Sequence, residues 1–173
     1  MKFRSILLSE HSRKATDTIL HAIKEDTSRI SELMECFFDD NLRLCQRAAW
    51  PVGDLGEKYP TLMIPYLPQM IDTLRAPKHD AVIRNTVRTW QNMPIPEDFQ
   101  GEVFDICFNY ILDPKIPVAI RAFSMTVCAN ICKGVPELAS ELILAITDQI
   151  EFGSPGIRSS GLRIIKELSS TTI

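Results

Sequence analysis

The sequence has little glycine, and its cysteines show no pairing motif. Only 7 of its 173 residues are glycine, which favours helix over sheet. The cysteines are odd in number and contain no Cys-x-x-Cys pair: Cys36, Cys45, Cys107, Cys128 and Cys132. A disulfide framework is therefore not expected. No stretch approaches the ~20 apolar residues that span a bilayer. The apolar run near the N-terminus, Ile6–Leu8, is too short for the core of a signal peptide. We expect a reducing, cytoplasmic setting and no membrane partner.

Motifs that carry chemistry are also missing. The sequence has no glycine-rich phosphate loop, nucleophile elbow or kinase-like motif. Its histidines, His11, His21 and His79, are scattered, and no His-Glu-x-x-His pattern occurs. Cys128 and Cys132 are four residues apart on a predicted helix, but no further ligand lies near them in the sequence. We therefore predict no catalytic residues, no metal and no cofactor.

The composition is that of an ordinary soluble domain. Apolar residues make up 45% and charged residues 24%, which is sufficient for a continuous core in a single domain spanning 1–173. The formal net charge is −3 and the isoelectric point is near 5.6. The charge of the whole molecule therefore disfavours binding to nucleic acid, which would need a local basic patch.

An internal repeat of 37 residues runs through the chain. Arginines separated by exactly this interval occur at Arg47, Arg84, Arg121 and Arg158, and the residue before the last three is isoleucine. Upstream of the first three arginines, apolar residues recur at one helical spacing: Leu33, Met34 and Phe37; Met70, Ile71 and Leu74; Cys107, Phe108 and Ile111. This pattern predicts an amphipathic helix before each arginine and a second helix that contains it.

Helix-breaking residues divide the units. Turns are predicted at 39–41, 76–80, 113–115 and 153–156, and prolines recur where each next first helix is expected to start: Pro60, Pro94, Pro96 and Pro136. The segment before the repeats, about 12–25, has Ala15, Ile19 and Ile23 on one face and is predicted to be a capping helix. We predict a cap over 1–26, repeats over about 27–63, 64–100, 101–137 and 138–173, and nine helices.

These features resemble the HEAT/armadillo-like helical repeat proteins, whose units are helix pairs of similar length with an arginine early in the second helix. Stretches such as 46–51 and 101–107 also resemble a family of small uncharacterised bacterial proteins. The resemblance implies an all-α fold, a right-handed α-solenoid (α-α superhelix) of about four helix pairs. In such a solenoid the first helices form the convex side and the second helices line the concave side.

Charge separates between the two sets of helices. The first-helix segments, 27–40, 60–75, 97–113 and 137–151, hold 2 basic and 14 acidic residues. The second-helix segments, 41–59, 79–93, 115–134 and 157–168, hold 11 basic and 4 acidic residues. The second-helix surface is therefore predicted to attract an acidic partner.

Residues outside the arginine column are the better candidates for contacting a partner. The resemblance implies that Arg47, Arg84, Arg121 and Arg158 pair with turn groups inside the stack. The predicted partner-binding residues are Arg88, Arg163, Lys58, Gln91, Trp50 and Trp90, although the spacing of Trp90 with Ile83 and Val87 favours the core. Trp50 precedes Pro51, where the helix is expected to kink or tighten.

The prediction is a non-catalytic binding or scaffold module that uses its concave second-helix face to bind a protein or peptide. The alternative is a nucleic-acid-binding protein related to the HEAT-like DNA glycosylases, which use tryptophans and an aspartate on a basic concave face. Trp50, Asp54, Arg88 and Trp90 could take those parts.

Overall fold

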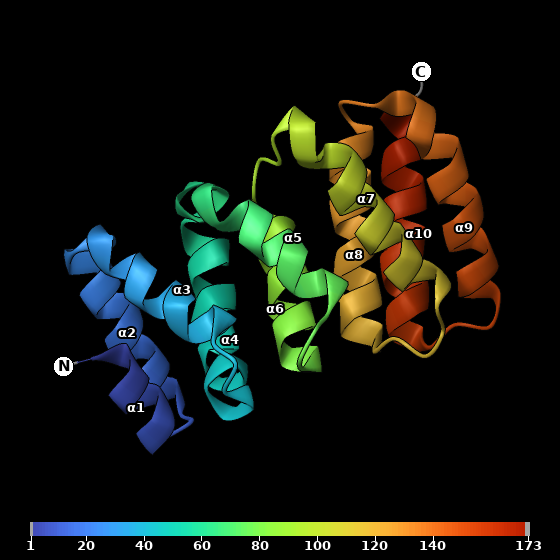
Figure 1. Ribbon diagram of the computed structural model, residues 1–173. Coiled ribbons are helices and arrows are strands. Elements are labelled where there is room, and N and C mark those ends of the chain that lie inside the picture. The colour runs from blue at the N-terminus through green and yellow to red at the C-terminus, as the bar shows by residue number, and fades with distance from the viewer. Residues whose placement is uncertain (1, 172–173) are drawn as a thin grey trace. The chain divides into compact units, whose positions relative to one another are not determined.

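The computed structural model describes residues 2–171, and over that range the protein is all-α. Ten α-helices and three short 3-10 helices account for its regular structure, and no strand occurs in the described range (Figure 1). The all-α prediction is confirmed. The chain divides into two compact units, Met1–Pro94 and Ile95–Ile173, and each is described by itself.

Unit 1 contains six α-helices and two 3-10 helices. They are α1 (Phe3–Ser9), α2 (Arg13–Glu25), η1 (Thr27–Arg29), α3 (Ile30–Phe38), α4 (Leu42–Lys58), η2 (Pro60–Tyr66), α5 (Leu67–Arg75) and α6 (Asp80–Trp90). Helix α4 is the centre of this unit, because α1, α2, α3 and α6 all pack against it. The predicted capping helix is present as α2, with Ser12 as its N-cap.

The estimate of nine helices is wrong by one, because α1 precedes α2. Helix α1 has only seven residues. Its buried side chains, Phe3, Ile6 and Leu7, are spaced by three and four residues, so they lie on one face and pack against α3 and α4. A helix this short is stable only through such packing, and it contains too few residues to show a clear periodicity in the sequence.

The turns lie where helix-breaking residues predict them. Between α3 and α4, the Asp39 carboxylate accepts a hydrogen bond from the backbone N–H of Asn41, and the Asn41 side chain caps α4 by accepting one from Leu44. Pro60 and Pro136 each begin a 3-10 helix that leads into α5 or α9, and Pro96 is the N-cap of α7. Proline suits these positions because it has no backbone N–H to leave unpaired.

Helices α4 and α6 approach each other very closely at two glycines. A Cβ atom added at Gly53 would lie 2.3 Å from Oδ1 of Asn85, and one added at Gly56 would lie 2.4 Å from side-chain atoms of Thr89. Asn85 and Thr89 bond back to carbonyls of their own helix, at Ala81 and Asn85. The crossing of α4 and α6 therefore depends on the missing side chains at Gly53 and Gly56.

Unit 2 consists of two helix pairs. Its helices are α7 (Glu97–Leu112), α8 (Val118–Cys132), η3 (Pro136–Leu138), α9 (Ala139–Glu151) and α10 (Pro155–Thr171). Helix α7 packs against α8, α9 packs against α10, and the two pairs join through contacts of α7 with α9 and of α8 with α10. Unit 2 is thus two layers of helices, with the first helices in one layer and the second helices in the other (Figure 1).

Replacing Gly56 by alanine tests the close crossing. We expect Gly56→Ala to lower the free energy of unfolding by about 1–3 kcal/mol, because the new methyl group would overlap the Thr89 side chain. Gly101→Ala is the matched control, since Gly101 lies inside α7 with nothing within 4 Å of the added Cβ. That change should stabilise the helix by up to about 1 kcal/mol. Urea denaturation followed by circular dichroism measures both, and equal effects of the two changes would contradict the crossing.

Candidate partner-binding surface

The repeated arginines lie near the start of the second helices α4, α6, α8 and α10. In unit 1, the Arg47 guanidinium donates hydrogen bonds to the backbone carbonyls of Leu7, at 2.8 Å, and Leu8, at 3.1 Å. These carbonyls belong to the last turn of α1, where no helical N–H can reach them. Arg47 therefore ties α4 to the end of α1, whereas Arg84 on α6 is exposed.

In unit 2 the arginines tie second helices to first helices. Arg121 is buried, and its Nε and Nη2 atoms each donate to the carbonyl of Ile111, the next-to-last residue of α7, at 3.2 Å. Its Nη2 also donates to Oε1 of Gln149 on α9 at 2.6 Å. Burial lowers the pKa of Arg121, and the charge of Asp113 partly offsets this effect. Arg158 on α10 donates to the carbonyl of Glu151, at the end of α9, at 3.1 Å.

A cluster of five charged side chains connects α2 with the second helices α4 and α6 of unit 1. Asp54 of α4 is almost completely buried, with 7% of its side chain exposed, and its two carboxylate oxygens contact two arginines. Arg13 of α2 lies 2.7 Å from Oδ2, and Arg88 of α6 lies 3.1 Å from Oδ1. Arg13 also pairs with Asp17, and Arg88 also pairs with Glu57. Because three carboxylates surround two guanidinium groups, Arg88 is not the isolated positive charge that the sequence count suggests.

The other predicted partner-binding residues of unit 1 differ widely in exposure. Trp50, one helical turn before Asp54, is half-buried, and its ring packs edge-on against that of His11 with centroids 5.6 Å apart. Trp90 is only 1% exposed and belongs to the core, as its spacing indicates. Gln91 is half-buried next to Arg88, and Lys58, the last residue of α4, is exposed. The structure thus brings Trp50, Asp54 and Arg88 to one place and buries Trp90 elsewhere.

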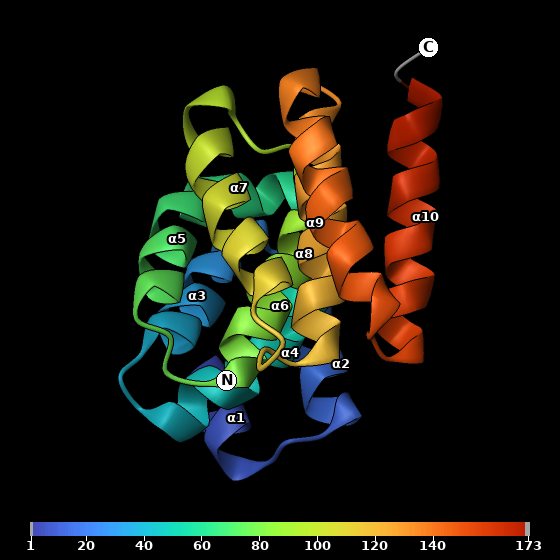
Figure 2. The same ribbon diagram turned by 90° about the vertical axis from the view of Figure 1, so that its right-hand side faces the viewer.

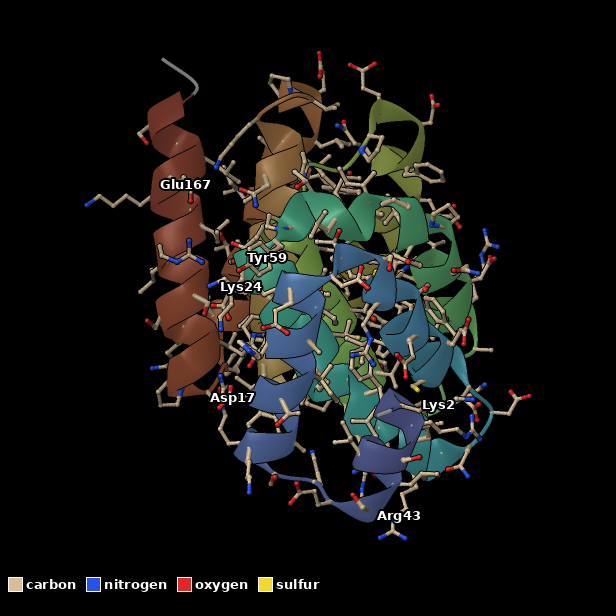
Figure 3. The ribbon with its side chains drawn as sticks, turned by 90° about the vertical axis from the view of Figure 1, so that its left-hand side faces the viewer. Lys2, Asp17, Lys24, Arg43, Tyr59 and Glu167 are labelled. Atoms are coloured by element: carbon tan, nitrogen blue, oxygen red, sulfur yellow. The ribbon has the colours of Figure 1, made fainter. Side chains whose placement is uncertain are left out.

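Figure 3 views unit 1 from the side on which α2 lies. Asp17 of α2 and Tyr59, just after α4, are labelled there, and both are exposed. The participation of α2 was not apparent from the sequence, because Arg13 and Asp54 are 41 residues apart and belong to different helix pairs. In the sequence, only the positive charge at the start of α2 and the aspartate among apolar and glycine residues of α4 hint at this contact.

Arg163 lies on α10, a second helix of unit 2, and is exposed. Its Nη2 donates a hydrogen bond to Oγ1 of Thr126 on α8 at 3.0 Å, and its Nη1 lies 3.6 Å from Glu167. Glu167 pairs more closely with Lys133 at 2.8 Å. Helix α8 contains no acidic residue, and Lys166 adds a further exposed positive charge on α10. The exposed charges of α10 are therefore mainly basic, and Lys133 follows α8.

A cavity of about 550 Å³ lies in unit 1 between α1 and α3, and the sequence did not indicate it. Its lining combines both charge signs: Lys2, Arg4, Arg29, Glu32, Glu35, Cys36 and Asp39. Arg4 pairs with Asp39, whose pKa is lowered by that hydrogen bond, and Arg29 pairs with Glu32. Because the lining holds three positive and three negative side chains, it presents no strong net field of either sign.

The cysteines and histidines show no cofactor-binding arrangement. Among the described residues, no group of three or more His, Cys, Asp and Glu side chains lies close enough to hold a metal ion. All five cysteines are free and buried, and the Cys128 thiol contacts the carbonyl of Phe104 and Cys107. Within residues 2–171, no helix is both long and apolar enough to cross a membrane.

A comparison with protein-family models matches residues 3–168 to a family described as HEAT repeat domain. The match covers the helix pairs of both units and the two helices that precede them. No curated protein and no solved structure matches the chain. The family match is therefore what relates this chain to known proteins.

The buried carboxylate of Asp54 can be tested by removing its charge. Asp54→Asn should lower the free energy of unfolding by about 1–3 kcal/mol, because Arg13 and Arg88 lose their shared partner. Asp17→Asn is the matched control, since Asp17 also pairs with Arg13 but is exposed, and its effect should stay below about 0.5 kcal/mol. Chemical denaturation measures both, and an Asp54→Asn change as small as the control would refute the role of the cluster.

The cysteines provide a second test. Burial raises the pKa of the Cys36 and Cys132 thiols to about 11, with the other three thiols also buried. At about pH 8 a buried, protonated thiol reacts slowly, so the folded protein should release almost no thionitrobenzoate from Ellman's reagent over minutes. After unfolding in guanidinium chloride, all five thiols should react. Rapid reaction of any thiol in the folded protein would contradict this packing.

Proposed function

Because the chain belongs to the HEAT repeat domain family, we propose that it is a non-catalytic binding module whose second-helix surface binds an acidic segment of another protein. HEAT repeats form scaffolds that often mediate protein interactions, and the family is generally non-catalytic. Stacked helix pairs bury their apolar faces against one another, which leaves an extended surface of fixed shape for a partner.

The observation that carries the proposal is the segregation of charge between helices. The first-helix segments hold 14 of the acidic residues and the second-helix segments hold 11 of the basic ones. If both sets of helices carried balanced charges, no such separation of acidic from basic residues would occur. A surface of one sign attracts a partner of the opposite sign and raises the rate at which the two associate.

The contacts described above refine which residues would bind the partner. In unit 2, Arg163 and Lys166 are exposed on a helix whose only carboxylate is Glu167. In unit 1, Lys58 is exposed, and Trp50 and Gln91 are half-buried, whereas Arg88 is held by Asp54 and Glu57. We propose Arg163 as the principal contact. Trp90, which is buried, would act only by keeping α6 in place.

Nucleic-acid binding is the second candidate, because Trp50, Asp54 and Arg88 lie together on α4 and α6. A HEAT-like DNA glycosylase would use such residues on a basic face. Two observations weigh against this candidate: the arginines Arg13 and Arg88 occupy both oxygens of the Asp54 carboxylate, and Trp90 is buried. The formal charge of −3 also opposes binding to phosphates.

The proposed cellular setting is the cytoplasm. All five cysteines are free, which fits a compartment where thiols stay reduced. The proposal includes no cofactor and no metal ion.

A charge reversal at Arg163 tests the proposed surface. Arg163→Glu should reduce recovery of the partner in affinity capture from extracts of the source organism by roughly fivefold, which corresponds to about 1 kcal/mol of binding free energy. Arg75→Glu is the matched control, because Arg75 is an exposed arginine of the first helix α5. Quantitative mass spectrometry identifies proteins that Arg163→Glu loses and Arg75→Glu retains. If the two variants recover the same proteins as the wild type, the partner does not bind at the proposed surface.

Salt dependence separates the two candidates. A gel-shift assay with single-stranded and duplex DNA at about 50 mM and about 200 mM salt should show no shift for a protein-binding module, whereas contacts with several phosphates would give a strong shift that the higher salt abolishes. A salt-sensitive shift that Arg88→Glu removes would favour nucleic-acid binding over the proposed function. Thermal unfolding of each variant shows whether it is folded under the assay conditions.

A further inference from the structure

The exposed side of α7 in unit 2 carries a stripe of mainly acidic residues. The stripe lies opposite the buried side chains of this helix, which packs on α8. Its residues recur at intervals of four and three positions, so they share one side of the helix. They are Asp98, Glu102, Asp105, Asn109 and Leu112, and all but the half-buried Glu102 are exposed.

The stripe recurs on the next first helix. On η3 and α9, each residue lies 39 positions after its counterpart on α7, and all five are exposed: Glu137, Glu141, Leu144, Asp148 and Glu151. The buried side chains of α9 lie on the other side, where Ile146 approaches Gly161 of α10. Because α7 contacts α9, the two stripes lie on adjacent helices, and Figure 2 views unit 2 from the side of α9. We call the two stripes together the acidic face.

The negative charge of the acidic face is not balanced by nearby positive charge. Seven of its ten residues are acidic, and no lysine or arginine occurs within 97–113 or 136–151. Within the described residues 2–171, Asp105, Glu141 and Asp148 form no ion pair, whereas Asp39 and Asp72 on the first helices of unit 1 pair with arginines. Like charges three or four residues apart on a helix repel each other. Positive charges from a partner would relieve this repulsion.

Exposed apolar side chains lie among these carboxylates. Leu144 is 65% exposed and Phe152, directly after α9, is 88% exposed, the highest values for large apolar side chains in the described part of the chain. Leu112, at the end of α7, is also exposed. Single apolar residues are normal on a surface, but Leu144 and Phe152 lie four residues on either side of Asp148. A carboxylate between two apolar side chains suits a ligand that is both positively charged and apolar.

We propose that the acidic face binds a basic amphipathic helix of another protein, in which lysines or arginines flank apolar residues. Leu144 and Phe152 are eight residues apart, which corresponds to about 12 Å along a helix axis. They therefore match two apolar residues that are separated by two turns of the partner helix. The positive side chains beside those residues then lie near Asp148 and its neighbouring carboxylates.

The charge of the acidic face excludes other classes of partner. Nucleic acids and anionic membranes carry phosphates, which the carboxylates repel. An acidic protein segment, the partner proposed for the second helices, is repelled in the same way. The acidic face and the surface around Arg163 lie on different helices and attract opposite charges, so the two proposals are independent.

Fluorescence anisotropy with two synthetic peptides tests the proposal. The first is a labelled helical peptide of lysine and alanine that carries two leucines separated by two turns. The second has serine in place of both leucines, so the two peptides have the same charge. In about 150 mM salt, which screens weak long-range attraction, the wild type should bind the leucine peptide at least about tenfold more tightly than the serine peptide. Equal affinities, or no binding of either peptide, would overturn the proposal.

Single substitutions locate the binding. Leu144→Ser and Phe152→Ser should each weaken binding of the leucine peptide by about fivefold and leave the serine peptide unaffected, whereas Asp148→Lys should weaken both peptides. The matched controls are Leu162→Ser, at an exposed leucine of α10, and Glu35→Lys, at an exposed carboxylate of α3 in unit 1. Circular dichroism shows that each variant is folded. If the three variants of α9 and its following turn bind as tightly as the controls, the acidic face is not the binding surface.

Sedimentation velocity of the protein without peptide distinguishes this partner from a second copy of the chain. Self-association of the wild type that Leu144→Ser abolishes would overturn the proposal, because another copy would then cover the acidic face. Arg163→Glu should bind the leucine peptide like the wild type. A loss of peptide binding in Arg163→Glu would also contradict the proposal, since this residue lies on α10 and outside the acidic face.

Discussion

The carboxylate of Asp54 is the group on which unit 1 depends, because it is a charge buried where three helices meet. It lies on α4 and forms ion pairs with Arg13 of α2 and Arg88 of α6. A buried carboxylate without partners is strongly unfavourable, so the positions of α2 and α6 relative to α4 are restricted to those that supply the two arginines. The close crossing of α4 and α6 at Gly53 and Gly56 satisfies the same restriction, since it brings α6 near enough for Arg88 to reach Asp54.

This cluster also changes how the surface charge should be counted. Counting by helix assigns Arg88 to a basic surface, but Asp54 and Glu57 neutralise it, and Arg13 adds a further pair with Asp17. A guanidinium that already has two carboxylate partners loses one of them when it binds an acidic ligand. Arg163, whose Glu167 partner is shared with Lys133, loses less. The argument for partner binding is therefore stronger in unit 2 than in unit 1.

The features that could be predicted from the sequence are those that recur every 37 residues. The arginine interval of 37 residues, the turns and the apolar faces each repeat, so they indicate helix pairs without knowledge of their packing. The features that were not predictable involve single contacts between distant residues. Helix α1 is too short for a visible period, the Arg13–Asp54 pair joins residues 41 apart, and Gly53 and Gly56 serve a close helix crossing that no local pattern reveals.

The contrast between Arg121 and Arg163 shows why the repeated residues are not the ones proposed to bind a partner. Both lie on second helices of unit 2, but Arg121 occupies the repeated position, where the end of the preceding helix presents carbonyls without partners. A side chain in that position is used by the fold, and it is buried as a result. Arg163 is five residues beyond the repeated arginine of its own helix, where the second layer faces solvent. Its side chain reaches Thr126 of α8 but stays exposed, so a repeat protein can vary such a position to suit its partner while its fold stays the same.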